Sequence, residues 1–290
     1  MTETKLDVVR DPKRVRERIA DWRARGMTVA VVPTMGALHE GHLSLVRRGQ
    51  EVADRTVASV FVNPAQFAPG EDFDAYPRGE AQDFARLADV GCDLAYAPPR
   101  SAMYPDGFAT SVRVDAYADI LCAASRPHFF GGVATVVTKL LNQCRPDVAV
   151  FGEKDYQQLL IVRRLARDLD LDVEIVGAPI VREPDGLAMS SRNAYLTTAQ
   201  RAVAGRLNAI MAAVVRAIEA GEPIAAAIAA GRADLNAAGF DRIDYLEARD
   251  AADLSAPGDR LAERHLRLFA AVYLGETRLI DNRAINARGN

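Results

Sequence analysis

Short apolar segments alternate with longer amphipathic segments between residues 27 and 176, and this alternation constrains the fold more than any other feature of the chain. The apolar segments predict strands at 27–32, 56–62, 93–97, 148–151 and 173–176. The amphipathic segments predict helices at 42–53, 79–90, 133–143 and 157–169. Apolar strands separated by amphipathic helices are typical of a parallel sheet with helices on both faces. We therefore predict an α/β fold with a doubly wound parallel sheet.

The pattern changes after about residue 180. Alanine-rich segments predict helices at 197–220 and 223–238, and strand-like segments follow at 243–248, 266–274 and 277–281. A turn-rich segment at 181–186 marks the boundary. We therefore predict a Rossmann-like domain at 1–180 and a smaller C-terminal α+β domain at 181–290.

Charge and cysteine content narrow the class of protein. The net charge of −3, from 36 basic and 39 acidic residues, argues against a nucleic-acid-binding surface over the whole protein. The three cysteines show neither a disulfide pattern nor a zinc-site pattern, which favours reduced thiols in a cytoplasmic protein. Residues 1–26 are charged and amphipathic without the apolar core of a secretion signal, and no apolar run could span a membrane. We expect no nucleic-acid or membrane partner.

The turn between the first predicted strand and its helix contains His39-Glu40-Gly41-His42. Free backbone amides and the positive end of a helix dipole favour phosphate at such a turn, and histidine adds a donor. A zinc protease needs histidines four positions apart, whereas these are three apart. A Walker A loop needs Lys-Ser/Thr where this chain has His42-Leu43. We predict a phosphate site; the alternative is an incidental pair of surface histidines.

Two further segments suit a polyphosphate. In Met189-Ser190-Ser191-Arg192-Asn193, hydroxyls lie beside an arginine that can bind phosphate oxygens, although a helix N-cap explains the serines equally well. In 152–155, a glycine permits close backbone approach and Lys154 can neutralise phosphate charge. The alternative for that segment is that Glu153 and Asp155 merely complement a helix dipole.

Two weaker signals lie after the second strand. In Asn63-Pro64-Ala65-Gln66-Phe67, a polar amide beside an aromatic ring suits a small hydroxylated acid, but Asn-Pro is also a routine turn signal. Asp83 is a candidate Mg²⁺ contact, although aspartates on helix surfaces are usually just solvated.

Taken together, these segments identify a family resemblance. The pairing of 39–42 with the Met-Ser-Ser-Arg-Asn segment resembles the HIGH/KMSKS nucleotidyl-transferase superfamily. More closely, PTMGALHEGH, FVNPAQF, FGEKDYQQL and AMSSRNAYL resemble the pantothenate synthetase (pantoate–β-alanine ligase) family, in order and spacing, from about residue 29 to 281. The resemblance implies an ATP-dependent, AMP-forming ligase of coenzyme A biosynthesis that condenses (R)-pantoate with β-alanine through a bound pantoyl adenylate. It also implies Mg²⁺ with ATP, a cytoplasmic homodimer, nucleotide and pantoate binding by 1–180, and a lid at 181–290.

The resemblance also implies residue roles. His42, His39 and Lys154 are the expected catalytic residues, with His42 stabilising the pentavalent phosphorus by donating to phosphate oxygens. Gln66 and Gln158 match the pantoate-binding glutamines, and Gln66 also matches a β-alanine contact. No protein ligand of a metal is expected. The residues expected to bind ATP are Met35, Gly36, Ala37, Leu38, His39, Glu40, Gly41, His42, Gly152, Glu153, Lys154, Asp155, Val181, Met189, Ser190, Ser191 and Arg192.

Two other functions compete with the ligase. One is another nucleotidyltransferase of the same superfamily, against which Gln66 and Gln158 argue. The other is a non-catalytic adenine-nucleotide sensor, which would not need groups that stabilise a transition state.

Overall fold

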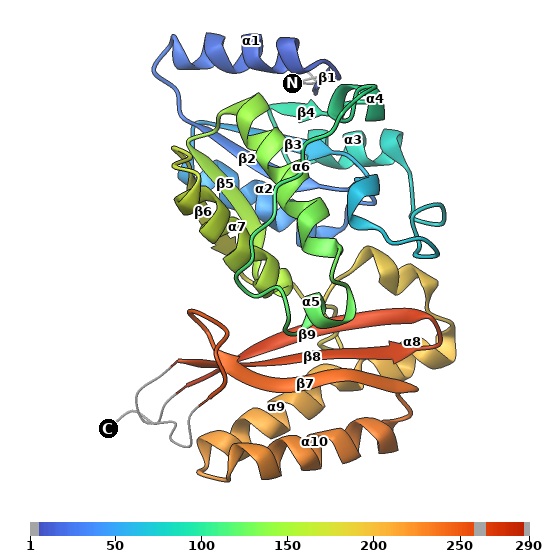
Figure 1. Cartoon of the computed structure of the whole chain (residues 1–290). Coiled ribbons are helices and arrows are strands. Elements are labelled where there is room, and N and C mark those ends of the chain that lie inside the picture. Colours follow the sequence, from blue (N-terminus) through green and yellow to red (C-terminus); the bar gives the residue numbers. More distant parts are fainter. Residues whose placement is uncertain (1–5, 258–264, 287–290) are drawn as a thin grey trace. The chain divides into compact units, whose positions relative to one another are not determined.

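The computed structural model describes residues 6–257 and 265–286, whose internal contacts group them into two compact units. Unit 1 consists of the residues up to Glu153 together with Ile161–Pro179, and unit 2 consists of Lys154–Leu160 and the residues from Ile180 onward. Residues 154–160 thus group with the C-terminal elements, whereas the sequence places them in the first domain. The functional division into 1–180 and 181–290 stays a prediction. Figure 1 colours both units along the chain.

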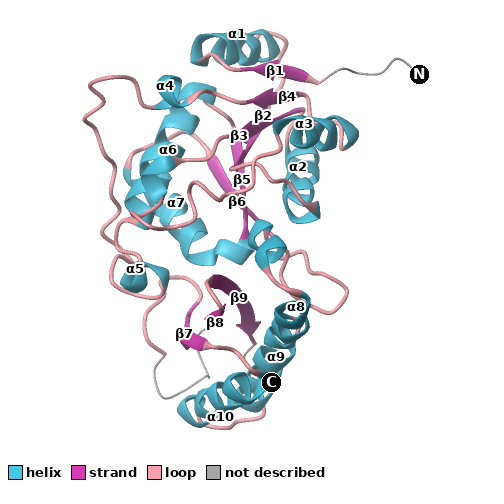
Figure 2. Ribbon diagram, turned by 90° about the vertical axis from the view of Figure 1, so that its right-hand side faces the viewer, coloured by secondary structure: helices cyan, strands magenta, loops and turns pink. Residues whose placement is uncertain are grey.

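Unit 1 contains a sheet of parallel strands in the order β1-β4-β3-β2-β5-β6. The strands are β1 (Asp7–Val9), β2 (Val29–Thr34), β3 (Arg55–Val60), β4 (Leu94–Tyr96), β5 (Val148–Gly152) and β6 (Glu174–Ala178). The helices are α1 (Pro12–Arg23), α2 (Glu40–Val52), α3 (Glu80–Asp89), α4 (Arg100–Met103), α5 (Cys122–Ser125), α6 (Phe129–Cys144) and α7 (Tyr156–Asp168), of which α7 begins in unit 2. Helices α2 and α3 cover one face of the sheet and α6 covers the other (Figure 2).

The central strand explains why the sequence forms a parallel sheet. Strand β2 pairs with β3 on one side and with β5 on the other, and its first four residues, Val29 to Val32, are completely buried. A strand that is covered on both faces needs apolar side chains at consecutive positions, which is the pattern found there. Val46 of α2 packs in the same core as Val32. The predicted doubly wound α/β fold is confirmed.

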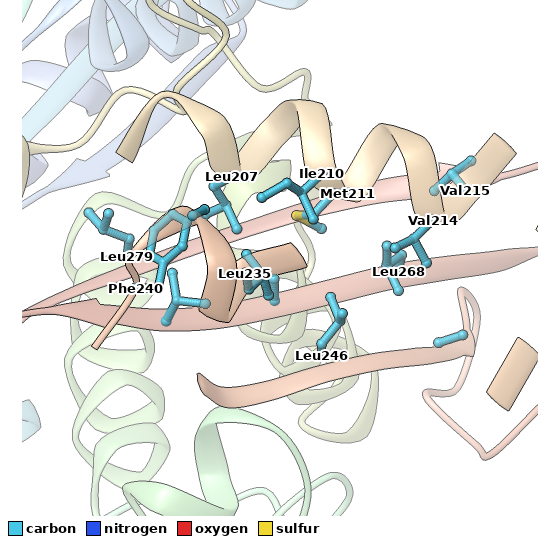
Figure 3. Close-up of a cluster of buried hydrophobic side chains, with 14 of the residues drawn as sticks. Leu207, Ile210, Met211, Val214, Val215, Leu235, Phe240, Leu246, Leu268 and Leu279 are labelled. Carbon is cyan, nitrogen blue, oxygen red and sulfur yellow. The ribbon is translucent and has the colours of Figure 1, made fainter. Parts of the chain in front are cut away.

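Unit 2 contains an antiparallel sheet in the order β7-β8-β9 together with helices α8, α9 and α10. The elements are α8 (Thr198–Ala204), α9 (Arg206–Glu219), α10 (Ile224–Ala238), β7 (Arg242–Asp250), β8 (Leu266–Leu274) and β9 (Thr277–Ile285). Side chains from α9, α10 and the strands form one buried cluster, which includes Met211, Leu235 and Leu268 (Figure 3). The predicted smaller α+β part is therefore present.

The structure also differs from the sequence prediction in several elements, and the short helices α4 and α5 were not predicted. Strand β1 and helix α1 lie in the segment that the sequence described only as charged and amphipathic; α1 begins at Pro12 after the N-cap Asp11, and β1 pairs with β4. The single helix predicted at 197–220 is wrong, because Gly205 separates α8 from α9 and glycine costs about 1 kcal/mol within a helix. Among the described residues, no helix is long and apolar enough to cross a membrane.

Candidate functional site

The order of the strands in unit 1 locates the first part of the candidate site. The chain runs from β2 to β3 on one side of β2 and later returns to β5 on the other side. Ligands of such sheets bind beyond the carboxyl ends of the strands at the point where the order reverses. The turn from Met35 to His42 follows β2, and Gly152 ends β5. The structure therefore brings the turn after β2 and Gly152 to the same edge of the sheet.

Asp83 of α3 holds the first half of this turn. Its carboxylate accepts the N–H of Ala37 at Oδ2 (2.9 Å) and the N–H of Leu38 at Oδ1 (2.8 Å), and the residue is only 3% exposed. Gly36 has a φ of +81°, and a Cβ there would lie 2.9 Å from the same carboxylate. Only glycine suits that position. Neither sequence interpretation of Asp83, metal contact or solvated side chain, describes what it does: it shapes the turn.

The two histidines hold the second half of the turn. His39 is the N-cap of α2, and its Nδ1 accepts the N–H of Gly41 (3.1 Å), while Nδ1 of His42 accepts the N–H of His39 (3.3 Å). The ring centroids lie 4.1 Å apart. A neutral histidine whose Nδ1 accepts a hydrogen bond has its proton on Nε2. Both imidazoles are therefore set as Nε2–H donors.

This geometry corrects one sequence expectation. The backbone amides of the turn were expected to be free for phosphate, but those of residues 37, 38, 39 and 41 donate to side chains of this chain. The two Nδ1 acceptors and the carboxylate of Asp83 therefore hold the backbone of the turn. The side chain of Glu40, by contrast, forms an ion pair with Arg47 further along the same helix.

Gln66 lies beside the turn and is held by Asn63 and Met35. It ends a short 3₁₀ helix, η1 (Pro64–Gln66); its Nε2 lies 3.1 Å from Sδ of Met35, and its Oε1 accepts from Asn63 (3.0 Å). Asn63, 1% exposed, also donates to the carbonyl of Gly132 (3.1 Å) and accepts from the Tyr104 hydroxyl (2.7 Å). Burial raises the pKa of Tyr104 to about 12, so that its hydroxyl remains a donor.

Gly132 and Arg126 complete the surroundings of Gln66. A Cβ on Gly132 would lie 2.2 Å from the carbonyl oxygen of Ala65, so α6 approaches η1 as closely as backbone allows. Arg126 donates to the carbonyl of Gln66 (3.4 Å) and to both carboxylate oxygens of Glu71 (2.9 and 2.6 Å). Burial raises the pKa of Glu71, but the hydrogen bonds and charge of Arg126 outweigh it and leave that pKa below its usual value. Sequence reasoning missed Gly132, because its role depends on a contact between segments far apart in the chain.

The predicted residues around the start of α7 are held by the sheet of unit 2. Nδ2 of Asn282 on β9 donates to the carbonyl of Lys154 (2.9 Å), and the Tyr156 hydroxyl donates to the carbonyl of Ala251 (3.0 Å). Of the two glutamines that follow, Gln157 is buried and Gln158, the predicted pantoate contact, is partly exposed. Asp155 and Lys154 are likewise partly exposed.

The segment from Val181 to Arg192 forms a short hairpin followed by a 3₁₀ helix. The carbonyl of Val181 accepts the N–H of Met189 (3.0 Å). Ser190 is the N-cap of η3 (Ser191–Tyr195) and accepts the N–H of Arg192 (3.3 Å), so the capping interpretation is confirmed for this serine. Ser191 and Arg192 are partly exposed. Capping and ligand binding are compatible here, because a hydroxyl that accepts can still donate.

The predicted site residues thus fall into two sets, each held within its own unit. Unit 1 holds residues 35–42, Gln66, Gly152 and Glu153, and unit 2 holds Lys154, Asp155, Gln158, Val181 and residues 189–192. Among residues 6–257 and 265–286, no three His, Cys, Asp or Glu side chains form a group that could hold a metal ion.

Comparisons with known proteins agree with the resemblance seen in the sequence. A family model described as pantoate-beta-alanine ligase matches residues 7–284. The pantothenate synthetase of Caulobacter vibrioides is 58% identical over 280 residues, which cover 96% of this chain and 98% of that protein. That of Paramagnetospirillum magneticum is 57% identical over 279 residues, with coverage of 96% and 98%.

Solved structures give the same result. The crystal structure of pantothenate synthetase from Thermus thermophilus matches with a TM-score of 0.90 and 44% identity, over 96% of this chain and 99% of that chain. The pantoate-beta-alanine ligase from Francisella tularensis, complexed with beta-gamma ATP and beta-alanine, matches with a TM-score of 0.81 and 31% identity, over 96% and 97%.

Proposed function

The chain belongs to the pantoate-β-alanine ligase family, and we infer that it joins pantoate to β-alanine at the expense of ATP. The match over residues 7–284 covers both units, so the whole described structure is that of the enzyme. The structural observation that best supports the chemistry is the turn after β2, where Asp83 and the two histidines hold the backbone so that two imidazole donors are set at the switch point of the sheet.

We propose that the reaction proceeds in two steps. A carboxylate oxygen of pantoate attacks the α-phosphorus of ATP, the bond to the bridging oxygen breaks, and pyrophosphate leaves with that electron pair. The amine of β-alanine then attacks the acyl carbon of pantoyl adenylate, loses a proton, and displaces AMP. A carboxylate is a poor acyl donor, and adenylation supplies the leaving group that it lacks.

The catalytic residues are proposed to act on charge that builds during the first step. His42 and His39 donate Nε2–H to phosphate oxygens, because their Nδ1 atoms already accept backbone hydrogen bonds. Lys154 neutralises phosphate charge with its ammonium group. Preorganised donors of this kind need no reorientation when the pentavalent phosphorus forms, which is where their advantage over water lies.

ATP is proposed to bind residues of both sets: 35–42, Gly152 and Glu153 of unit 1, and Lys154, Asp155, Val181 and 189–192 of unit 2. Gln66 and Gln158 are proposed to bind pantoate, and Gln66 also β-alanine. Gln66 is buried, and its side-chain amide contacts Asn63 and Met35, which hold that amide in one orientation. A fixed amide suits recognition of a small hydroxy acid.

Mg²⁺ is proposed to enter with ATP. Mg²⁺ prefers phosphate and water oxygens as ligands, so it needs few ligands from the protein. The described residues fit such an ion: they contain no group of three His, Cys, Asp or Glu side chains that could hold a metal, and both carboxylate oxygens of Asp83 accept backbone N–H groups. The ion would offset charge on the triphosphate.

The adenylate step is tested by ATP–pyrophosphate exchange with pantoate present and β-alanine absent. We expect exchange that requires pantoate and is abolished without it. If the complete reaction turns over while no exchange occurs, the two-step scheme is wrong. Exchange without pantoate would favour another nucleotidyltransferase, and ATP binding without any turnover would favour a nucleotide sensor.

The role of His42 is tested by His42→Ala. Removing one preorganised donor should lower the exchange rate about 10²–10³-fold. Circular dichroism should show an unchanged fold, and a rate near that of the unsubstituted enzyme would refute the role.

The proposed lid is tested by proteolysis, with cleavage within 185–192 expected to slow when ATP is added. We also propose that the protein is a cytoplasmic homodimer, and light scattering, which gives the mass in solution, tests the dimer.

A further inference from the structure

Two adjacent polar residues of β9 are buried although most of the sheet around them is apolar. Asp281 is 3% exposed and Asn282 is 2% exposed. Successive side chains of a strand point to opposite faces of the sheet, so the two residues serve different neighbours. Buried polar groups are costly unless they are hydrogen-bonded, and both residues are.

Asn282 holds the segment that contains Lys154. Its Nδ2 donates to the carbonyl of Lys154 at 2.9 Å, and its Oδ1 accepts from the guanidinium of Arg267 on β8. That guanidinium lies 4.0 Å from the ring centroid of Tyr156, two residues after Lys154. The backbone of Lys154 and the ring of Tyr156 are therefore both fixed against the sheet of unit 2.

Asp281 holds the hairpin that precedes Met189. Its two carboxylate oxygens accept from the guanidinium of Arg182 at 2.6 and 2.9 Å, and Oδ1 also accepts the backbone N–H of Asn282 at 2.7 Å. Arg182 in turn donates to the carbonyl of Gly186 at 3.0 Å, across the hairpin closed by the bridge between Arg182 and Ala188. Because Asp281 neutralises Arg182, this arginine acts as a support for the hairpin.

We propose that Asp281 and Asn282 are positioning residues, which set Lys154 and the segment 181–192 at a fixed separation for binding of one triphosphate. A continuous path joins the two: Lys154 carbonyl, Asn282 side chain, Asn282 backbone N–H, Asp281 carboxylate, Arg182, Gly186 carbonyl. The buried ion pair of Asp281 and Arg182 contributes little to stability, because burying its charges costs free energy. Apolar side chains could fill the same volume without that desolvation cost, so stability alone does not explain these polar residues. The proposal rests on the assignment of both segments to ATP in the proposed function.

The chain offers a matched control on the same sheet. Asp244 of β7 pairs with Arg278 of β9 at 2.7 Å, with side-chain exposures of 19% and 13%. The hydrogen bonds of this pair join two strands of the sheet to each other and form no part of the path from Lys154 to Gly186. Asp281→Asn and Asp244→Asn each remove one charge from a largely buried ion pair of unit 2, but only the first lies on the path to the ATP segments.

The experiment compares Asp281→Asn, Asn282→Ala and Asp244→Asn in the full-length chain. Urea unfolding measures stability, titration with α,β-methylene ATP measures nucleotide affinity, and ATP–pyrophosphate exchange measures chemistry. All three variants should lose stability. Only Asp281→Asn and Asn282→Ala should bind the analogue more weakly and lower kcat/KM for ATP, by roughly 10²-fold, the effect of about 1 Å of misplacement. The KM for pantoate should change far less.

Equal nucleotide affinity and kcat/KM for ATP in Asp281→Asn, Asn282→Ala and Asp244→Asn would overturn the proposal. If Asp281→Asn does not fold, Arg182→Lys keeps the charge but loses the paired hydrogen bonds, and the same comparison is made with it. If the unsubstituted protein binds the analogue but does not join pantoate to β-alanine, the proposed function fails while the nucleotide titrations still decide the positioning role.

Discussion

Replacing Asp83 by Asn tests whether this one buried carboxylate shapes the turn that holds His39 and His42. The carboxylate accepts two backbone N–H groups, from Ala37 at 2.9 Å and from Leu38 at 2.8 Å. An asparagine side chain has nearly the same shape but one oxygen only. Whichever way its amide is turned, one backbone N–H keeps an acceptor and the other faces an NH₂ group that cannot accept.

The size of the effect follows from these two bonds. A hydrogen bond to a charged group contributes about 1.5–3 kcal/mol, and a buried donor left without a partner costs about 1–3 kcal/mol. Asp83→Asn should therefore lower the free energy of unfolding by about 2–3 kcal/mol, and Asp83→Ala, which loses both bonds, by about 3–6 kcal/mol. The turn would also shift, and a shift of about 1 Å at the reacting groups lowers the rate roughly 10²-fold.

Asp89 provides the control, because it is exposed on the same helix, α3. Asp89→Asn changes the net charge equally but leaves both acceptors of the turn in place. Urea unfolding and ATP–pyrophosphate exchange should show a loss in Asp83→Asn and almost none in Asp89→Asn. If the two variants have the same stability and the same exchange rate, the turn does not depend on Asp83 and the reasoning is refuted.

Three further predictions follow from burial and charge. Gly132→Ala should lower the free energy of unfolding by about 1–3 kcal/mol and raise the KM for pantoate, because its Cβ would meet the η1 backbone; Gly131→Ala, whose Cβ would meet nothing within 4 Å, should do neither. Because the pKa of Glu71 is lowered in the folded state, its contribution to stability is complete above its unfolded pKa and is lost as pH falls through the folded pKa. Urea midpoints measured between about pH 6 and pH 3 should therefore fall less steeply for Glu71→Gln, and parallel curves would contradict this. Burial raises the pKa of Cys92 and Cys144 to about 12, so neither thiol should react with iodoacetamide at about pH 8 until urea unfolds the protein, as mass spectrometry would show.

The secondary structure was largely predictable because its signal is local. Strands such as β2 and β5 are apolar over consecutive residues, and helices such as α2 repeat their apolar residues every three to four positions. These patterns are read within a window of a few residues. Strand β1 was not predicted, because three residues are too few to show a pattern and because its pairing with β4 joins segments almost ninety positions apart.

The candidate site was predictable as a set of segments but not as a geometry. The turn at 35–42 and the segment around Gln66 were singled out by their residue types and by the family resemblance, and their roles stay predictions. Their partners were not found. Asp83 lies 46 positions from Ala37, Gly132 lies 69 positions from Asn63, and Asn282 lies 128 positions from Lys154. No pattern along the chain distinguishes these residues from ordinary surface or loop residues.

What the sequence alone determined was the order of most strands and helices and the family, and from the family came the prediction of which residues meet ATP and pantoate. The tertiary structure decided which donors and acceptors of those residues form hydrogen bonds within the protein. Asp83 and the paired imidazoles accept the N–H groups of Ala37, Leu38, His39 and Gly41, which the sequence alone leaves open for phosphate. The physical reason is that folding brings together groups that are far apart in the sequence, and these groups form hydrogen bonds with one another. Only the folded chain therefore shows which backbone N–H groups already have an acceptor.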